Sequence, residues 1–189
     1  ASSASVYGLG KNGFNEKCIT EPLNYYANSK MSFDFFAKQK IADNPKAKIV
    51  GLRYFNVYGK NEGVKETGAS PVHTFYQQAK NTNEIKIFKG SRNYLRDFIH
   101  VDDVVDITKK AVDFPSGIYN VGTGKTRSFF DIANIISGWT GAKITEIPFP
   151  QHLIGKYQEY TCSDNTKINS IGCSRNRISL EEGIKRTIY

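Results

Sequence analysis

Two polar side chains of residues 26–30 are placed to do chemistry together. Tyr26 and Lys30 are four residues apart, and residues at that spacing lie on one face of a helix. Alone, this pair is common and indicates only a tyrosine packed on a helix beside a solvated lysine. Ser3, which lies in a Ser-rich segment 23 residues before Tyr26, adds a third group. Ser, Tyr and Lys together are typical of hydride transfer.

Hydride transfer from an alcohol needs a base that removes the hydroxyl proton. The phenol of a tyrosine has an unperturbed pKa of about 10, and lowering it by ~3 units takes roughly 4 kcal/mol of preferential stabilisation of the tyrosinate. The ammonium of Lys30 and the positive charge of an oxidised cofactor can supply this stabilisation. Ser3 would hydrogen-bond the substrate oxygen and orient it. The predicted catalytic group is therefore Ser3, Tyr26 and Lys30.

The elements that would position these groups are short apolar strands that alternate with amphipathic helices, which is typical of α/β proteins. The apolar run of residues 49–55 predicts a strand buried on both faces of a parallel sheet, and residues 1–7 predict the end of another. Further strands are expected at residues 85–88, 96–101, 117–121 and 143–147. Helices are expected at residues 23–42, 71–80, 104–114, 129–139 and 180–188.

Local signals support three of these helices. Phe33, Phe36 and Ala37 recur at helical spacing within the first one. Asp102 or Asp103 would cap the third helix, and Ser128 would cap the fourth.

Composition indicates an ordinary globular protein. The chain has 189 residues, of which 39% are hydrophobic and 23% charged, enough for one domain with a sizeable core or for two small interleaved lobes. No apolar run approaches the ~20 residues that span a bilayer, so we expect no membrane partner. The chain has neither a secretory signal pattern nor a starting methionine, and we expect a truncation or a cleavage point there.

Charge, cysteines and histidines exclude several classes of function. The net charge is +8, but the Lys and Arg residues are spread along the chain, which favours a solvated surface or a basic pocket for a phosphorylated small substrate over nucleic-acid binding. Cys18, Cys162 and Cys173 have no metal-ligand spacing, and His73, His100 and His152 are scattered. We expect neither a disulfide framework nor a metal site, and the reducing cytoplasm as the location.

The glycines of residues 121–126 are similar to part of a phosphate-binding P-loop. That motif requires a glycine five residues before Gly124, where this chain has Tyr119. We therefore expect a tight turn between a strand and a helix.

Four stretches in this order carry a resemblance to a known family. They are residues 2–8 (SSASVYG), the pair Tyr26 and Lys30, residues 53–59 (RYFNVYG) and residues 96–104 (RDFIHVDDV). Together they resemble the extended short-chain dehydrogenase/reductases, which act on nucleotide sugars, and the resemblance covers essentially the whole chain.

This resemblance implies an α/β fold: the C-terminal part of a Rossmann-type doubly wound sheet, interleaved with a smaller α/β substrate-binding domain. Residues 1–55 and 99–124 would be the remaining part of the NADP-binding domain. Residues 56–98 and 125–189 would form the substrate-binding domain.

Finer details are similar to one group within that family, the ADP-glyceromanno-heptose 6-epimerases. They are residues 61–65 (NEGVK), 88–91 (FKGS), 148–150 (PFP) and 155–158 (GKYQ). This similarity implies an isomerase that uses NADP, or NAD, to invert C6″ of the heptose in a precursor of the lipopolysaccharide core. It also implies that Lys65 is a second acid/base group.

The resemblance further implies which residues meet the cofactor and the substrate. Tyr26, Lys30, Val57 and Val64 match cofactor-contacting positions, with Val64 where a histidine is expected. Thr67 and Thr74 stand where a serine and a histidine are expected to touch substrate. All positions that match substrate contacts are Asn56, Thr67, Thr74, Phe88, Lys89, Gly90, Ser91, Arg96 and Tyr157.

The implied mechanism is a transient oxidation. The C–H bond of an unactivated carbinol is far too weakly acidic for simple deprotonation, so hydride passes to the cofactor and returns to the opposite face of the ketone. Turning the ketone over moves its oxygen, and two acid/base groups on different sides solve this problem. Tyr26 and Lys65 are the candidates.

The family also opens with a glycine-rich turn that binds the cofactor pyrophosphate, and no G-x-x-G-x-x-G occurs here. We therefore expect the chain to begin midway through the Rossmann-type sheet and to be inactive alone. We expect the full-length form to be a homo-oligomer.

Other hypotheses stay open. The enzyme alternatives are a UDP-hexose 4-epimerase and a sugar 4,6-dehydratase, although dehydratases place an Asp-Glu pair after the catalytic Ser or Thr, where this chain has Ala4 and Ser5. A non-catalytic binding protein is disfavoured by the intact Ser3, Tyr26 and Lys30. A catalytically incompetent fragment is the remaining hypothesis.

Overall fold

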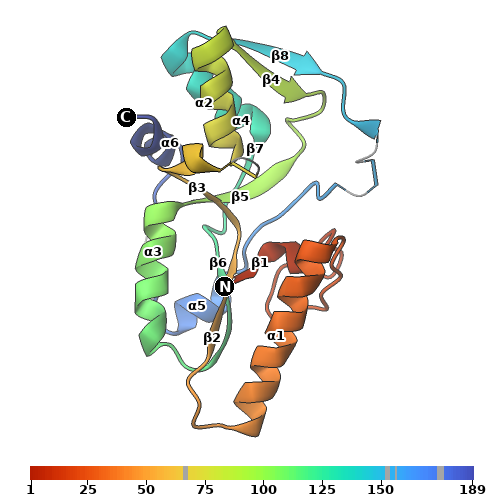
Figure 1. Ribbon diagram of the computed structural model, residues 1–189, viewed down its shortest axis with the longest axis vertical. Coiled ribbons are helices and arrows are strands. Elements are labelled where there is room, and N and C mark those ends of the chain that lie inside the picture. Colours follow the sequence, from red (N-terminus) through yellow and green to blue (C-terminus); the bar gives the residue numbers. More distant parts are fainter. Residues whose placement is uncertain (66–67, 152–153, 156, 174–176) are drawn as a thin grey trace.

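The molecule has two lobes stacked along its long axis. The computed structural model describes residues 1–65, 68–151, 154–155, 157–173 and 177–189. In Figure 1 the lower lobe holds β1, β2, β6, α1, α3 and α5, and the upper lobe holds α2, α4, β4, β8 and α6. The strands β3 and β5 cross between the two lobes.

The lower lobe is built on a parallel sheet. Its strands β1 (Ser2–Ser3), β2 (Val50–Tyr54) and β6 (Gly117–Val121) lie in the order β1-β2-β6. The three central residues of β2 are buried, which confirms the buried parallel strand predicted for residues 49–55. The helices α1 (Tyr25–Asp43) and α3 (Val101–Lys110) lie on opposite sides of β2 (Figure 1). The fold is therefore α/β of the doubly wound Rossmann type.

The helix α1 begins at a side-chain cap and buries small residues. The Asn24 side chain accepts a hydrogen bond from the backbone N of Ala27 at 2.8 Å, which satisfies a donor at the helix start. Ala27, Asp34 and Ala37 are the buried positions. The aromatic residues whose spacing predicted the helix are Phe33 and Phe36, and they are 50% and 55% exposed. Helical spacing identified the helix, but not which side faces the sheet.

A second sheet joins the lobes. Its strands β3 (Asn56–Tyr58), β5 (Leu95–His100) and β7 (Thr126–Ser128) lie in the order β3-β5-β7, and only the β5–β7 pair is antiparallel.

The junction from β5 into α3 differs from expectation. The helix begins at Val101 rather than Val104, because Nδ1 of His100 accepts a hydrogen bond from the backbone N of Asp102 at 3.2 Å and caps the helix directly after the strand. The expected cap by Asp102 or Asp103 was wrong. Both carboxylates lie in the first turn, where negative charge is favourable to the helix dipole. The helix ends at Lys110 and is followed by the 3-10 turn η3 (Ala111–Asp113).

In the upper lobe two helices pack against a two-stranded sheet, and a third helix packs against those two helices. The strands β4 (Glu84–Phe88) and β8 (Lys143–Ile147) are parallel, and the helices are α2 (Pro71–Thr82), α4 (Phe129–Thr140) and α6 (Leu180–Ile188). Ser128 caps α4 in a capping box with Asp131, as predicted for Ser128. The core of this lobe includes Val72, Phe75, Ile85, Ile132, Ile136 and Ile184.

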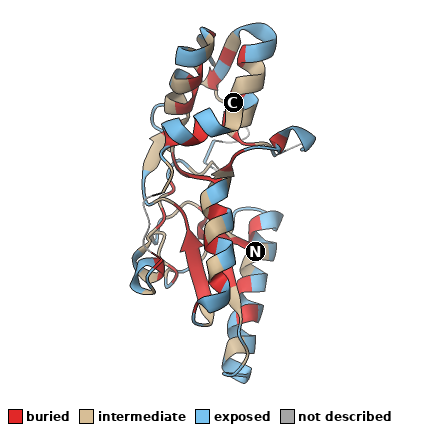
Figure 2. Cartoon of the chain, turned by 90° about the vertical axis from the view of Figure 1, so that its left-hand side faces the viewer, coloured by how far each residue is buried: buried red, intermediate tan, exposed pale blue. Residues whose placement is uncertain are grey.

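The chain returns to the lower lobe before it ends. The short helix α5 (Thr166–Ser170) packs against β6, and Ile168 and Cys173 share a core with Leu52 and Val121. Figure 2 shows buried residues concentrated in the strands at the centre of the lower lobe, while the helices keep exposed outer faces. The predicted division at residues 56, 99 and 125 stays a prediction.

Candidate active site

Ser3, Tyr26 and Lys30 lie at one end of the lower sheet. Ser3 ends β1, and its Oγ accepts a hydrogen bond from the backbone N of Ser5 at 3.2 Å, at the start of the 3-10 turn η1 (Ala4–Tyr7). On the first turns of α1, Nζ of Lys30 is 5.6 Å from the ring centroid of Tyr26 and 3.5 Å from the carbonyl oxygen of Ala1. The ammonium is thus beside the tyrosine and next to the strand that carries Ser3. Tyr26 is 57% exposed, so much of this residue is accessible from solvent.

A buried polar network links the elements that surround these three groups. Nε of Arg53 on β2 lies 2.8 Å from Oδ2 of Asp34 on α1, and both side chains are at most 3% exposed. Nη1 of Arg53 donates to the Tyr7 hydroxyl at 2.9 Å, and this hydroxyl donates to Oδ1 of Asn120 on β6 at 2.7 Å. Burial raises the pKa of Tyr7 to about 12 despite the charge of Arg53, so the phenol stays neutral. The network ties together α1, η1, β2 and β6.

Sequence reasoning missed this network. The signal for it was a charged Arg53 inside the otherwise apolar run of residues 49–55. A buried charge needs a partner, but the partner, Asp34, is 19 residues away and no local pattern identifies it.

Lys65 lies on a separate loop. The 3-10 turn η2 (Glu62–Val64) precedes it, and Nζ of Lys65 is 3.2 Å from Oε2 of Glu62. The Lys65 side chain is 48% exposed and Val64 is 87% exposed. Thr67, a predicted substrate contact, lies outside the described residues. Lys65, the second acid/base candidate, therefore lies on the loop after β3, whereas Tyr26 lies on α1.

Glu62 is a further buried charged residue that sequence reasoning did not single out. It is only 4% exposed. Burial by itself would raise the pKa of Glu62, but hydrogen bonds from Ser70, Gly59 and Lys65 outweigh it and hold this pKa below its ordinary value. The signal was its place within residues 61–65, three residues before Lys65.

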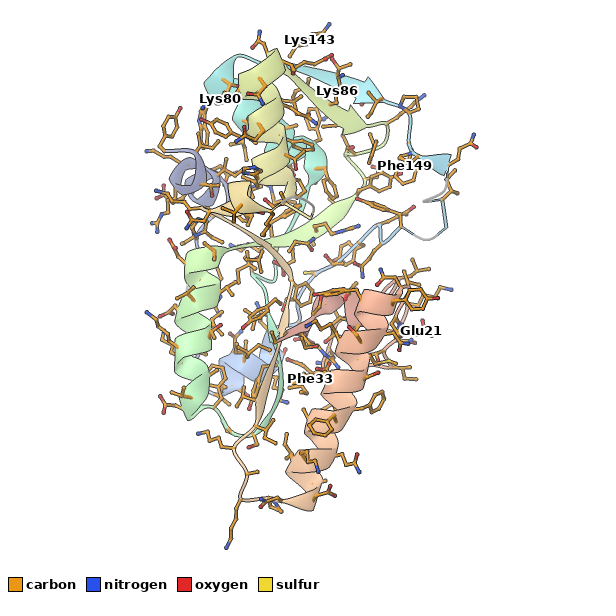
Figure 3. All side chains as sticks on the ribbon, in the orientation of Figure 1. Glu21, Phe33, Lys80, Lys86, Lys143 and Phe149 are labelled. Atoms are coloured by element: carbon orange, nitrogen blue, oxygen red, sulfur yellow. The ribbon has the colours of Figure 1, made fainter. Side chains whose placement is uncertain are left out.

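A cavity of about 330 Å³ opens in the upper lobe. Four of the predicted substrate contacts line it, namely Thr74, Phe88, Ser91 and Tyr157. Much of its wall is aromatic, since the lining residues include Phe75, Phe88, Tyr94, Phe129 and Tyr157. Phe149, labelled in Figure 3 beside the segment that follows β8, packs against this wall, with its ring centroid 5.3–5.5 Å from those of Phe88, Tyr94 and Tyr157.

Arg96 lies beside this cavity. Its guanidinium carbon is 5.0 Å from the ring centroid of Tyr157 and 5.7 Å from that of Phe129, and both of these residues line the cavity. Burial lowers the pKa of Arg96 from its ordinary value, but the guanidinium stays charged. A stacked, buried guanidinium next to an aromatic cavity is suited to bind a phosphate group.

The other predicted residues lie on the strands and turns nearby. Lys89 is exposed and its backbone N donates to the carbonyl of Ile147 at 2.8 Å, and Gly90 adopts a φ of +87° in the turn after β4. On β3, Oδ1 of Asn56 is 3.5 Å from Oγ1 of Thr161. Val57 packs against the core of the lower lobe.

Two contacts join the cavity to the Ser3 region. Nε2 of Gln158 donates a hydrogen bond to the carbonyl of Gly8, and the rings of Phe14 and Tyr160 are 5.9 Å apart. The segment that follows Tyr157 is thereby fastened to the loop that follows Ser3.

The glycines of residues 121–126 approach a buried carboxylate. Asp97 on β5 accepts hydrogen bonds from the backbone N of Thr123, Gly124 and Ser163 at 2.8–3.0 Å, and from the Thr123 hydroxyl at 2.6 Å. A Cβ at Gly122 would lie 2.7 Å from Oδ2 of Asp97. These glycines therefore allow close backbone approach at a turn. The turn joins the strands β6 and β7, and not a strand and a helix as expected.

The part of the chain that the structure describes has neither a membrane-spanning helix nor a metal-binding cluster. None of its helices is long and apolar enough to cross a membrane. Nor does that part bring together three or more His, Cys, Asp or Glu side chains that could hold a metal ion.

Comparison with known proteins places this geometry in a family. A model of the NAD dependent epimerase/dehydratase family matches residues 1–122. The chain belongs to this family. Within it, the chain is 44% identical over 191 residues to ADP-L-glycero-D-manno-heptose-6-epimerase of Brachyspira hyodysenteriae, and 42% identical over 194 residues to the enzyme of that name from Alkalilimnicola ehrlichii. These matches cover 98% of this chain, and the chain spans 60% of the length of either relative.

Solved structures of similar enzymes have the same fold as this chain. The crystal structure of ADP-L-glycero-D-manno-heptose-6-epimerase from Helicobacter pylori superposes with a TM-score of 0.85 at 34% identity, over 99% of this chain and 57% of that one. UDP-glucose 4-epimerase of Thermotoga maritima, solved with UDP-glucose, has a TM-score of 0.82 at 28% identity, over 99% of this chain and 60% of that one. The predicted family resemblance is therefore confirmed.

Proposed function

We propose that this chain is part of an enzyme that inverts C6″ of ADP-glyceromanno-heptose by transient oxidation, with NADP or NAD as cofactor. The contact that carries the proposal is Nζ of Lys30 at 5.6 Å from the Tyr26 ring, beside the strand that ends in Ser3. Identities of 44% and 42% to enzymes named for this reaction support the choice of substrate. Because the chain spans 60% of their length, the activity is assigned to the longer protein: this chain together with the remaining length that the relatives have.

Tyr26 and Ser3 would handle the proton of the reacting hydroxyl. Tyr26 removes it as general base, and the ammonium of Lys30 stabilises the tyrosinate. The Ser3 hydroxyl accepts a hydrogen bond from Ser5 and still has its own hydrogen to donate to the substrate oxygen.

The residues present fit a nicotinamide cofactor. Ligands of open α/β sheets bind at the carboxyl ends of the strands, and Ser3 ends β1 there, with Tyr26 and Lys30 nearby on α1. A bound nicotinamide supplies the hydride acceptor and donor. We assign Tyr26, Lys30, Val57 and Val64 to contacts with it.

The cavity of the upper lobe would hold the nucleotide sugar. Its aromatic wall suits the flat face of a nucleobase, and the Arg96 guanidinium suits the diphosphate. Thr74, Phe88, Ser91 and Tyr157 line this cavity, and we assign the neighbouring Asn56, Thr67, Lys89 and Gly90 to the same binding site.

Inversion by this route requires two acid/base groups at different places in the site. The transient ketone must present each face to the hydride, and its oxygen moves when it turns over. Tyr26 on α1 would serve one orientation, and Lys65, on the loop after β3, would serve the other. Assembly of the longer protein as a homo-oligomer stays a prediction.

The test compares two reactions of Lys65→Met in the longer protein. This substitution keeps the apolar stem and removes the ammonium. Epimerisation, which needs both groups, should fall at least ~100-fold in kcat. Reduction of an aldehyde analogue at the reacting carbon by NADPH needs only Tyr26 and should survive. Lys65→Arg, which retains a cation, is the matched control for the loss of charge and should keep the substrate KM within about twofold.

Two outcomes would contradict the proposal. If Lys65→Met epimerises at the wild-type rate, Lys65 is not an acid/base group. If both activities fall together, Lys65 holds the loop rather than acting on the substrate. A 4-epimerase, which needs no second base, predicts one of these two results.

A further inference from the structure

Glu62 is a buried carboxylate with four hydrogen-bond donors around it. Its Oε1 accepts from the backbone N of Gly59 at 3.2 Å and from the Ser70 hydroxyl at 2.6 Å. Its Oε2 accepts from the backbone N of Ser70 at 2.6 Å and from Nζ of Lys65 at 3.2 Å. A carboxylate that is 4% exposed and bonded on both oxygens is held in one position.

The fourth of these donors, Nζ of Lys65, belongs to a long and flexible side chain. A lysine carries its ammonium on a flexible four-carbon stem, and the Lys65 side chain is 48% exposed. Contact with a fixed carboxylate limits the positions that this ammonium can take. The other three hydrogen bonds attach Glu62 to its surroundings, so the restraint on Lys65 does not depend on another mobile group.

Glu62 also connects Lys65 to the wall of the cavity. The Ser70 hydroxyl, which donates to Glu62, accepts a hydrogen bond from the backbone N of His73 at 3.3 Å and caps α2. The first turns of that helix contribute Pro71 and Thr74 to the cavity. The Lys65 ammonium is thus held, through Glu62 and Ser70, at a defined position relative to the cavity wall against which a substrate would lie.

We propose that Glu62 is the positioning residue for Lys65. Its carboxylate holds the ammonium at a set place relative to the cavity wall, so that the ammonium meets the orientation of the ketone that Tyr26 does not serve. The inference rests on the proposed function, in which Lys65 is the second acid/base group. Glu62 itself does not touch the substrate.

Glu62→Gln in the longer protein tests this role. A misplaced catalytic group lowers the rate by up to about 100-fold, so kcat for epimerisation should fall by about tenfold or more, with KM within about twofold. Reduction of the aldehyde analogue by NADPH should keep its rate. In a Lys65→Met background the same substitution should cause no further loss, because the group that Glu62 positions is already gone. Glu62→Asp keeps the charge and should show the same selective loss more weakly.

Ser70→Ala is the matched structural control. It removes one hydrogen bond to the same carboxylate and the side-chain cap of α2. The backbone N of residue 70 still donates to Oε2 of Glu62, which keeps the carboxylate attached to the start of α2 and in contact with Lys65. The Tm should fall while the ratio of epimerisation to aldehyde reduction stays at the wild-type value.

Three results would overturn the inference. Equal loss of both activities in Glu62→Gln and Glu62→Asp would make Glu62 a purely structural residue. A further loss of epimerisation in the Lys65→Met background would show that Glu62 acts by another route. Full epimerisation by Lys65→Met alone would refute the two-base assignment itself, and this inference with it, so the two failures are distinguishable.

Discussion

Removing the Arg53 guanidinium should destabilise the lower lobe more than removing any exposed arginine. In Arg53→Met, the carboxylate of Asp34 stays 3% exposed but loses its ion-pair partner at 2.8 Å, and the Tyr7 hydroxyl loses a donor at 2.9 Å. Breaking a buried pair on one side costs about 3–5 kcal/mol. The entropy of unfolding is about 2.1 cal/mol/K per residue, or about 0.66 kcal/mol/K for a longer protein of about 315 residues, of which these 189 residues are 60%. The Tm should therefore fall by about 5–8 °C.

The assay is thermal unfolding of the longer protein, followed by circular dichroism. Arg186→Met is the matched control, because Arg186 pairs with Glu182 at 2.8 Å at a site where both side chains are nearly half exposed, and exposed pairs contribute little. The Tm of this variant should stay close to that of the wild type. Adding Asp34→Leu to Arg53→Met removes the unpaired charge and should recover part of the loss. If Arg53→Met unfolds within 2 °C of the wild type, the network does not hold α1 against the sheet.

Three further predictions follow from the site and its supports. Tyr26→Phe keeps the ring but removes the ionisable oxygen, so kcat should fall at least ~100-fold; a rate within threefold of wild type would exclude Tyr26 as the base. Gly122→Ala places a Cβ 2.7 Å from Oδ2 of Asp97 and should cost about 1–3 kcal/mol in urea unfolding; unchanged stability would show that the turn adjusts. The pKa of Glu62 lies below its ordinary 4.5, so its stabilisation is present above that pH and lost as pH falls through the folded-state pKa. The Tm gap between wild type and Glu62→Gln should therefore shrink from pH 7 to pH 3, and a constant gap would contradict this.

Local patterns predicted much of the fold. Residues 117–121, 143–147 and 180–188 have the bounds expected from their local sequence. The start of α3 was missed by three residues, since a histidine ring at His100 does the capping that an aspartate was expected to do. The exposed Phe33 and Phe36 show that helical spacing alone does not reveal which side of a helix meets the sheet.

Part of the candidate site was also predictable from the sequence. The four-residue spacing of Tyr26 and Lys30 predicted the contact that the structure contains. The residues that line the cavity came from family resemblance, because they lie on elements far apart in the chain. The pairing of Arg53 with Asp34 and the contacts of Asp97 with Gly124 and Ser163 depend on the tertiary fold, so no local pattern could predict them.

The central claim is that inversion proceeds by transient oxidation. The most direct measurement is the deuterium content of the product at the inverted carbon, after the longer protein has turned over ADP-glyceromanno-heptose in D₂O. A hydride that leaves to a nicotinamide and returns from it never exchanges with solvent, so no deuterium should appear at that carbon. Deuterium at that carbon would mean that its hydrogen left as a proton, and would contradict the account.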